Sequence, residues 1–212
     1  MKIKSALSFD DVLLRPKFSD ILSRSEIDIT TNLRDTTFSL PVISSPMDTV
    51  TESSMATSLD SIGGLGIIHR YNSIKVQTAM IHEAHARGSK NIGFAVGVSG
   101  DYLDRAKAGV MAGANVVCVD IAHGHHSLMK NALKCLRSLL DSETLIVAGN
   151  VATLEGFNDL SDWGADAVRV GIGGGSICST RIQTGHGIPT FQSILECSQS
   201  DRNTALIADG GI

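Results

Sequence analysis

The 212-residue chain is poor in proline, in aromatic residues and in clustered basic charge. Four prolines stand against 21 glycines, and aromatic residues make up 4%, a balance typical of an alternating α/β protein with many tight turns. The net charge is -4 at pH 7 with no basic run, so we expect no nucleic-acid-binding surface. No window approaches about 18 uncharged apolar residues, which predicts no membrane span. The N-terminus lacks the continuous apolar core of a signal peptide.

Cysteine is also scarce, and its four copies lie far apart at positions 118, 135, 178 and 197 with no CxxC pair. Cys118 falls inside an apolar strand pattern and Cys135 inside a helical one. This arrangement favours reduced thiols over disulfides and predicts a cytoplasmic protein.

What is abundant is a series of short apolar segments rich in valine and isoleucine. They follow an N-terminal arm, residues 1–40, that we expect to be irregular. Most are apolar on both faces, as buried parallel strands are. The predicted strands are Leu40–Ser44, Gly64–Ile68, Asn91–Val98, Asn115–Ile121, Thr144–Ala148, Ala167–Gly171 and Ala205–Ala208.

Helical patterns alternate with these strands. Leucines and alanines recur at helical spacing over 128–140, with basic residues on the opposite face. Met55, Leu59 and Ile62 repeat this spacing in the first unit, and Phe191 to Leu195 in the last. Thr153 and Asp101 are candidate N-caps.

Strand-helix units that repeat every ~20–30 residues indicate parallel strands with crossover helices. A doubly wound open sheet and a TIM-type (β/α)8 barrel both satisfy this pattern. Polar residues follow nearly every strand with no visible reversal of order, which favours the barrel as a single domain over 1–212. Seven of eight strands are present, whereas such barrels take about 250 residues. We therefore expect a chain truncated at its C-terminus.

The stretch Val168–Arg181 combines a buried strand, a glycine-rich loop and a cysteine. Its glycines allow backbone groups to approach a ligand closely. Cys178 lies among small polar residues with Arg181 nearby, a setting that lowers a thiol pKa and suits a nucleophile. The alternative is a phosphate-binding glycine loop with an incidental cysteine.

The pattern Val-Gly-Ile-Gly-x-Gly-Ser-Ile-Cys-x-Thr closely resembles the active-site loop of the IMP dehydrogenase/GMP reductase family. Further similar stretches occur in order along the whole chain. They are Phe9–Leu14, Ser44–Glu52, Gly63–His69, Asp120–His125, Ala148–Thr153 and Ile207–Ile212. The resemblance implies the same barrel fold.

The resemblance also implies a reaction at C2 of a purine nucleoside monophosphate, with Cys178 as the nucleophile and Thr180 assisting. An IMP dehydrogenase converts IMP, NAD and water to XMP and NADH. A GMP reductase converts GMP and NADPH to IMP and ammonia. The motifs are mixed, and we favour the dehydrogenase with the reductase as the alternative.

Other roles follow from the same resemblance. Three backbone carbonyls match a potassium site, those of Gly173, Gly175 and Cys178. The cofactor-side positions are Asp120, Asn150, Arg169 and Gly171. The substrate-side positions are Ser45, Met47, Gly175, Ser176, Asp209, Gly210 and Gly211.

Simpler interpretations exist for several of these residues. Asp209-Gly-Gly could be a plain turn, and Asp120 could be an N-cap. His123, His125 and His126, like His82 and His85, lack acid or cysteine partners at ligand spacing, so we favour solvated or hydrogen-bonded histidines over a metal site.

The spacing between units also bears on domain organisation. Only about 20 residues separate His69 from the third strand and they fit one helix, so the regulatory CBS pair of most dehydrogenases is absent. A non-catalytic nucleotide-binding protein, an inactive fragment and a flavin-dependent barrel enzyme are the remaining alternatives. The resemblance implies a homotetramer for the intact protein.

Overall fold

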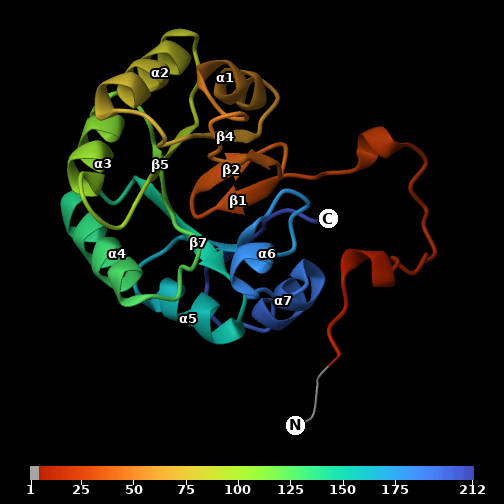
Figure 1. Ribbon diagram of the computed structural model, residues 1–212. Coiled ribbons are helices and arrows are strands. Elements are labelled where there is room, and N and C mark those ends of the chain that lie inside the picture. Colours follow the sequence, from red (N-terminus) through yellow and green to blue (C-terminus); the bar gives the residue numbers. More distant parts are fainter. Residues whose placement is uncertain (1–4) are drawn as a thin grey trace.

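A computed structural model describes residues 5–212 and shows one curled sheet of seven parallel strands. The strands follow one another in chain order, so the sheet has no point of reversal. This order excludes the doubly wound alternative, and Figure 1 shows the sheet curling into an open half-barrel with helices outside. The strands are β3 (Ile43–Ser44), β4 (Leu65–Ile68), β5 (Ile92–Val96), β6 (Val116–Asp120), β7 (Leu145–Val151), β8 (Ala167–Val170) and β9 (Ala205–Ala208).

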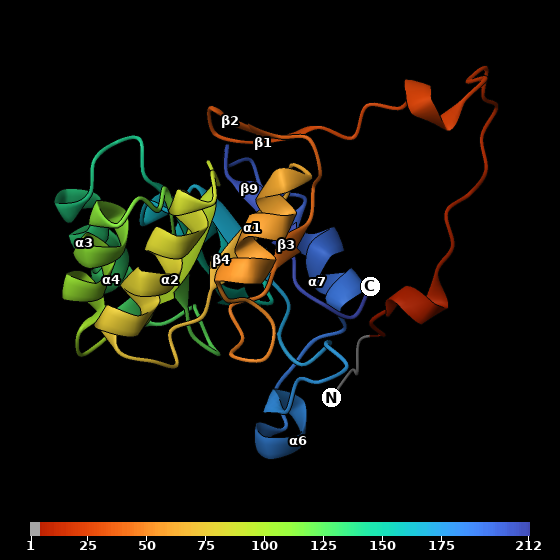
Figure 2. The same ribbon diagram turned by 90° about the horizontal axis from the view of Figure 1, so that it is seen from above.

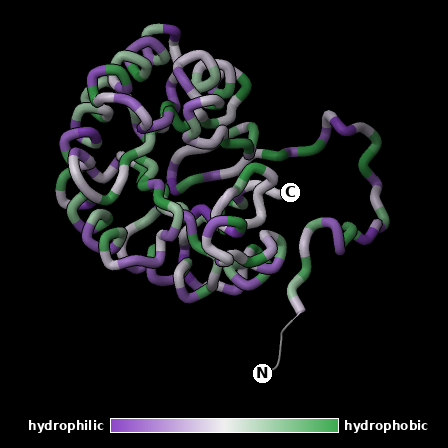
Figure 3. Tube along the Cα trace, viewed as in Figure 1, coloured by the Kyte–Doolittle hydropathy of each residue, from purple (hydrophilic) through white to green (hydrophobic). Residues whose placement is uncertain are grey.

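All seven predicted strands are confirmed, with ends that differ by a few residues. The strands β4, β5 and β8 are buried along their whole length, because parallel strands are covered by helices on one face and by the barrel interior on the other. In Figure 3 the strands form an apolar interior. The edges β3 and β9 each have one strand neighbour in the described sheet.

The helices connect the strands on the outside of the sheet. Helix α2 alone links β4 to β5, as the short spacing predicts. The helices are α1 (Ser53–Ser61), α2 (Ile74–Ala86), α3 (Tyr102–Met111), α4 (Ser127–Leu139), α5 (Leu154–Asp162), α6 (Thr180–Thr184) and α7 (Thr190–Cys197). Among residues 5–212, no helix is long and apolar enough to cross a membrane.

The predicted N-caps are half confirmed. The Thr153 hydroxyl accepts a hydrogen bond from the Gly156 NH at 3.2 Å and begins α5. Asp101 occupies the N-cap position of α3, but its carboxylate pairs with Arg105 instead of capping the helix.

The buried face of α1 differs from the prediction. Met55 and Ile62 are 41% and 61% exposed, whereas Ser53 and Ala56 are buried. The reason is a close approach of α1 to β4, since a Cβ at Gly66 would lie 2.4 Å from the Ala56 Cα. Small residues allow this contact, and bulky ones are turned outward.

The N-terminal arm is not irregular throughout, which corrects the prediction for residues 1–40. It contains two short 3-10 helices, Phe9–Asp11 and Arg24–Glu26, and an antiparallel hairpin of β1 (Thr31–Leu33) and β2 (Thr36–Phe38). Figure 2 shows the hairpin at the end of the barrel opposite α6, with the rest of the arm running away from the body.

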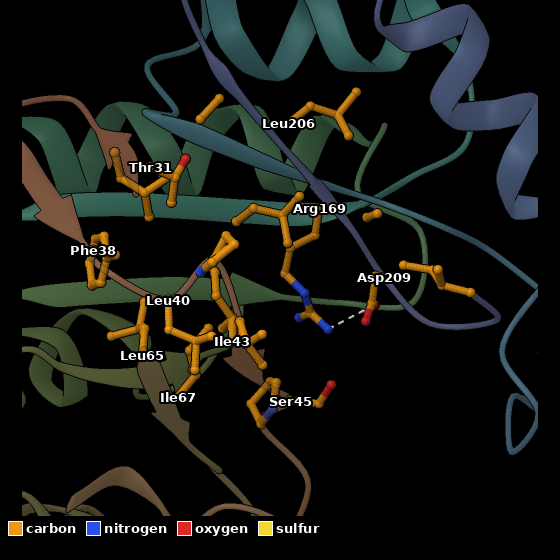
Figure 4. A pocket seen from close by; sticks show the side chains of 18 residues that line it. Thr31, Phe38, Leu40, Ile43, Ser45, Leu65, Ile67, Arg169, Leu206 and Asp209 are labelled. Carbon is orange, nitrogen blue, oxygen red and sulfur yellow. Dashed lines mark hydrogen bonds and ion pairs between the residues drawn. The ribbon is translucent and has the colours of Figure 1, made fainter. Parts of the chain in front are cut away.

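The hairpin closes the amino-terminal end of the barrel interior. Its Leu33 and Phe38 are buried with Leu65 and Ile67 in an inner core that the outer helices do not reach. Between β3, β9 and the hairpin lies a cavity of about 340 Å³ with a mostly apolar lining, to which the charged side chains of Arg169 and Asp209 also contribute (Figure 4).

We expect Phe38→Ala to lower the free energy of unfolding by about 3–5 kcal/mol, because it removes a buried aromatic ring and leaves a cavity. Thr37→Ala, on the exposed face of the same strand, is the matched control and should cost less than about 1 kcal/mol. Urea unfolding of both variants measures the difference. Equal effects would show that the hairpin does not close the barrel interior.

Candidate active site

A cavity of about 560 Å³ opens at the carboxyl ends of the strands. In barrels of this kind the loops at this end surround a single mouth. Segments following β3, β4, β6, β7, β8 and β9 all contribute to the lining. Every residue to which the sequence assigns a catalytic, substrate, cofactor or potassium role lies in this lining, namely Ser45, Met47, Asp120, Asn150, Arg169, Gly171, Gly173, Gly175, Ser176, Cys178, Thr180, Asp209, Gly210 and Gly211.

The centre of the site is a buried guanidinium between two carboxylates. Arg169 projects from β8 and is 7% exposed. It donates to Asp120 Oδ1 at 2.7 Å and to Asp209 Oδ2 at 2.9 Å, and Figure 4 shows the second of these pairs. The ends of β6, β8 and β9 are therefore held together by side-chain charge as well as by the sheet.

Asn150 completes this network from β7. Its Nδ2 donates to the Gly171 carbonyl at 2.7 Å and also to Asp209 Oδ2. Asp209 therefore uses one oxygen for both protein partners. Its Oδ1 has no hydrogen-bond partner within residues 5–212. A carboxylate oxygen held in place and left free is suited to accept hydrogen bonds from a ligand.

The simpler interpretations of the two aspartates fit the structure poorly. Helix α4 begins after His126, whose Nδ1 accepts from the Leu128 NH, so Asp120 is not the N-cap of that helix. Asp209 precedes two glycines with φ of 74° and 69°. That backbone forms a turn, but the Asp209 side chain is bound to other strands rather than to the turn itself.

The histidine cluster has hydrogen-bonding and capping roles. His125 Nε2 lies 2.8 Å from Asp159 Oδ2, and the His125 ring lies 6.0 Å from that of Trp163. With His126 acting as a cap, the favoured sequence interpretation accounts for both side chains.

Cys178 lies in the loop between β8 and α6, partly exposed to the cavity. Its backbone NH donates to the Gly175 carbonyl at 3.1 Å, which closes a tight turn. Gly173 and Gly187 face each other across the base of this loop, where a Cβ on Gly173 would lie 3.0 Å from the Gly187 Cα. The loop can close only because both positions are glycine.

The pKa of the Cys178 thiol is lowered, chiefly by the Thr180 side chain, against a smaller opposing effect of burial. Two other cysteines show the reverse. Burial raises the pKa of Cys118 to about 12 and that of Cys197 to about 11. Since the thiolate is the nucleophile, Cys178 is suited to covalent chemistry, and Cys118 and Cys197 are not.

Among the cavity-lining residues to which the sequence assigned no role are Arg70 and Tyr71. They directly follow His69, the last residue of a quoted motif, and their position after a strand end was the available signal. A further cavity of about 640 Å³ adjoins the 560 Å³ cavity and shares Gly173, Ser176 and Gly211 with it.

A family model described as "IMP dehydrogenase / GMP reductase domain" matches residues 6–212. An inosine-5'-monophosphate dehydrogenase of Nitrosopumilus maritimus is 30% identical over the whole chain and 71% of its own length. A GMP reductase of an Enterobacter species is 34% identical over 97% of the chain and 61% of its own length.

The fold is shared with a solved structure of a cysteine-to-alanine variant of GMP reductase from Trypanosoma brucei. The TM-score is 0.92 at 27% identity, covering 99% of this chain and 76% of that one. The chain thus spans between 61% and 76% of the length of these proteins.

We expect the rate of Cys178 alkylation by iodoacetamide to rise at a lower pH than that of an ordinary thiol, because the lowered pKa gives thiolate at lower pH. Thr180→Val removes the hydroxyl and should move the pH profile upward, while Thr184→Val in the same helix should not. Mass spectrometry of the peptide that contains Cys178 measures the rate. An unchanged profile in Thr180→Val would rule out the role of Thr180.

Proposed function

Because the chain belongs to the IMP dehydrogenase / GMP reductase family, we propose that it is a purine nucleotide oxidoreductase acting at C2 of the purine through a covalent adduct on Cys178. The observation that carries this proposal is the convergence of Cys178, Thr180, Asp120 and Asp209 on one cavity from loops far apart in sequence. A nucleotide-binding module would not need a thiol with a lowered pKa at that point.

The substrate is a purine nucleoside monophosphate, held across the β3 and β9 sides of the cavity. The free Oδ1 of Asp209 accepts hydrogen bonds from the ribose hydroxyls. Gly175, Ser176, Gly210 and Gly211 provide backbone NH groups and a hydroxyl for the phosphate. Ser45 and Met47, which line the cavity from the loop after β3, contact the base.

The chemical step starts with Cys178. Its thiolate adds to C2, the carbon between two ring nitrogens, and forms a carbon–sulfur bond. In a dehydrogenase the C2 hydrogen would then leave as hydride to NAD, and water would break the carbon–sulfur bond to release XMP and the thiol. In a reductase ammonia would leave C2, hydride from NADPH would add there, and the carbon–sulfur bond would break to release IMP and the thiolate. Thr180 stabilises the thiolate and lies where it can pass a proton to or from the attacking or leaving group.

The nicotinamide cofactor, NAD for a dehydrogenase and NADPH for a reductase, supplies the hydride acceptor or donor. The Asp120 side of the cavity suits it, because Asp120 lies at a strand end and keeps Oδ2 free of protein partners within the described residues. Asn150, Arg169 and Gly171 border the same region. We favour the dehydrogenase on the sequence motifs and keep the reductase as the alternative, since the similar proteins include both IMP dehydrogenases and GMP reductases.

Three further properties belong to the same proposal. The carbonyls of Gly173, Gly175 and Cys178 lie in one turn and would hold a potassium ion, although the Gly175 carbonyl already accepts from the Cys178 NH. The chain forms one catalytic-type unit without a CBS pair, since α2 alone joins β4 to β5. The intact protein is a cytoplasmic homotetramer.

The test is turnover of two substrate pairs, IMP with NAD and GMP with NADPH, each followed by nicotinamide absorbance and by chromatography of the purine product. We expect Cys178→Ala to lower kcat at least about a thousandfold, because the nucleophile is lost. Cys135→Ala, an exposed cysteine outside the cavity, should keep full activity.

Acid quenching during turnover should trap the purine on the peptide that contains Cys178. Nucleotide binding without any adduct would instead favour a binding protein. Activity retained in Cys178→Ala would exclude the covalent mechanism. XMP or IMP as the product decides between dehydrogenase and reductase.

A further inference from the structure

The beginning of the N-terminal arm contacts the barrel at helix α7. The Phe9 ring lies edge to face against the Phe191 ring of α7, with ring centroids 5.4 Å apart and ring planes at 76°. The backbone NH of Gln192, the next residue of α7, donates to the Leu7 carbonyl at 3.2 Å. Figures 1 and 2 both show the 3-10 helix Phe9–Asp11 (red) next to α7 (blue).

Phe9 differs in exposure from other large apolar side chains of the arm. Its side chain is partly buried. Four of the others are 94–99% exposed, namely Leu13, Leu14, Phe18 and Leu22. Within residues 5–30 of the arm, the bond to the Leu7 carbonyl is also the one backbone hydrogen bond that comes from the barrel. The arm is therefore attached at residues 7–9 and then runs away from the body, as Figure 2 shows.

The Leu7 carbonyl takes the place of a side-chain cap on α7. The first NH groups of a helix have no partner within the helix. Pro189 occupies the N-cap position of α7, which has no side-chain cap hydrogen bond. The Leu7 carbonyl instead accepts from the third residue of the helix. The first turn of α7 is thus held from outside, by the arm.

The same turn of α7 supports two glycine loops of the active site. Thr190 is 3% exposed, and a Cβ on Gly174 would lie 1.9 Å from its Oγ1. A Cβ on Gly211 would lie 2.3 Å from the Gly174 carbonyl oxygen and 3.5 Å from the same Thr190 Oγ1. The Ile188 NH donates to the Ile172 carbonyl at 3.1 Å. The loop after β8 and the loop after β9 therefore meet on the first turn of α7.

We propose that residues 7–9 brace this turn and that Phe9 is a positioning residue for Cys178, acting through Phe191 and Thr190. Phe9 lines the adjoining 640 Å³ cavity but not the 560 Å³ cavity that contains the thiol, so its effect is indirect. The catalytic use of Cys178 rests on the proposed function, whereas the bracing of its loop does not.

The Cys178 thiol is sensitive to the position of its loop. Its pKa is lowered by the Thr180 side chain and by backbone hydrogen bonds within the loop, including one with Gly173. Hydrogen bonds weaken steeply when their geometry is lost. A loop that is less firmly held would therefore keep less of the lowered pKa.

The test compares Phe9→Ala, Phe9→Tyr and Phe18→Ala by the pH profile of Cys178 alkylation with iodoacetamide, followed by mass spectrometry. We expect Phe9→Ala to move the profile to higher pH and to lower the rate at pH 7 about two- to tenfold, the factor that corresponds to one aromatic pair. Phe9→Tyr keeps the ring and should restore the profile. Phe18→Ala is the matched control, since that ring is 96% exposed, and it should leave the profile unchanged.

Two further measurements separate positioning from a general loosening of the fold. Alkylation of the exposed Cys135 in the same samples should be equal in all variants. Because Phe9 acts through Phe191, adding Phe9→Ala to Phe191→Ala should shift the Cys178 profile no further than Phe191→Ala does alone.

An unchanged Cys178 profile in Phe9→Ala would overturn the inference. An equal shift in Phe18→Ala, an equal change at Cys135 or additive shifts in the double variant would overturn it as well. Failure of the proposed function would appear differently, as the absence of a purine adduct on Cys178 while its alkylation still depends on Phe9.

Discussion

The architecture of the site depends on the burial of Arg169 between Asp120 and Asp209. Removing a guanidinium from water costs several kcal/mol unless it is paired and hydrogen-bonded. Here two carboxylates meet that demand at 2.7 and 2.9 Å. Because the three side chains lie at or next to the carboxyl ends of three different strands, the ion pairs act on the positions of those strands. The free oxygens of both aspartates then face the cavity from fixed positions.

Solvent exposure, rather than a nearby positive charge, decides which cysteine has a lowered pKa. Cys118 lies next to this guanidinium, with its sulfur 3.8 Å from an Arg169 nitrogen, yet burial raises its pKa to about 12. Cys178 lies in an open loop, where the Thr180 side chain and nearby backbone NH groups lower its pKa against a smaller effect of burial. Desolvation therefore outweighs a close charge in the interior.

Much of the fold could be predicted from the sequence because it depends on local pattern. Continuous apolar runs marked all seven strands, and the apolar stripe over 128–140 marked α4, whose Met129, Ala132, Leu133 and Leu136 are buried. The hairpin of β1 and β2 was missed because each strand has three residues, with a single buried side chain apiece. Such short strands show no detectable alternation.

The buried face of α1 was misassigned for a different reason. Hydrophobicity alone favours Met55 and Ile62, but the distance between α1 and β4 is set by Gly66, so the smaller Ala56 takes the inner position. Packing distance is a property of two elements together. No periodicity within one helix reveals it.

The residues of the site that belong to a continuous sequence motif could be predicted. Contacts between residues far apart in the sequence could not. The Cys178 loop and Asp209 belong to long local patterns. The link from Arg169 to Asp209 spans 40 residues of sequence, and that from Arg70 to Asp120 spans 50.

The two sides of the cavity differ in how firmly their residues are held. Asp120, Arg169 and Asp209 are held together by two ion pairs. The loop that carries Cys178 exposes Ile177 at 73%, and the following helix α6 exposes Ile182 at 78%. The loop is anchored mainly by backbone turns. Segments with few buried contacts lie at the low end of local stability. Under the proposed function, we expect a nucleotide bound to Asp209 to contact this loop as well, and so to couple substrate binding to the placement of the Cys178 thiolate.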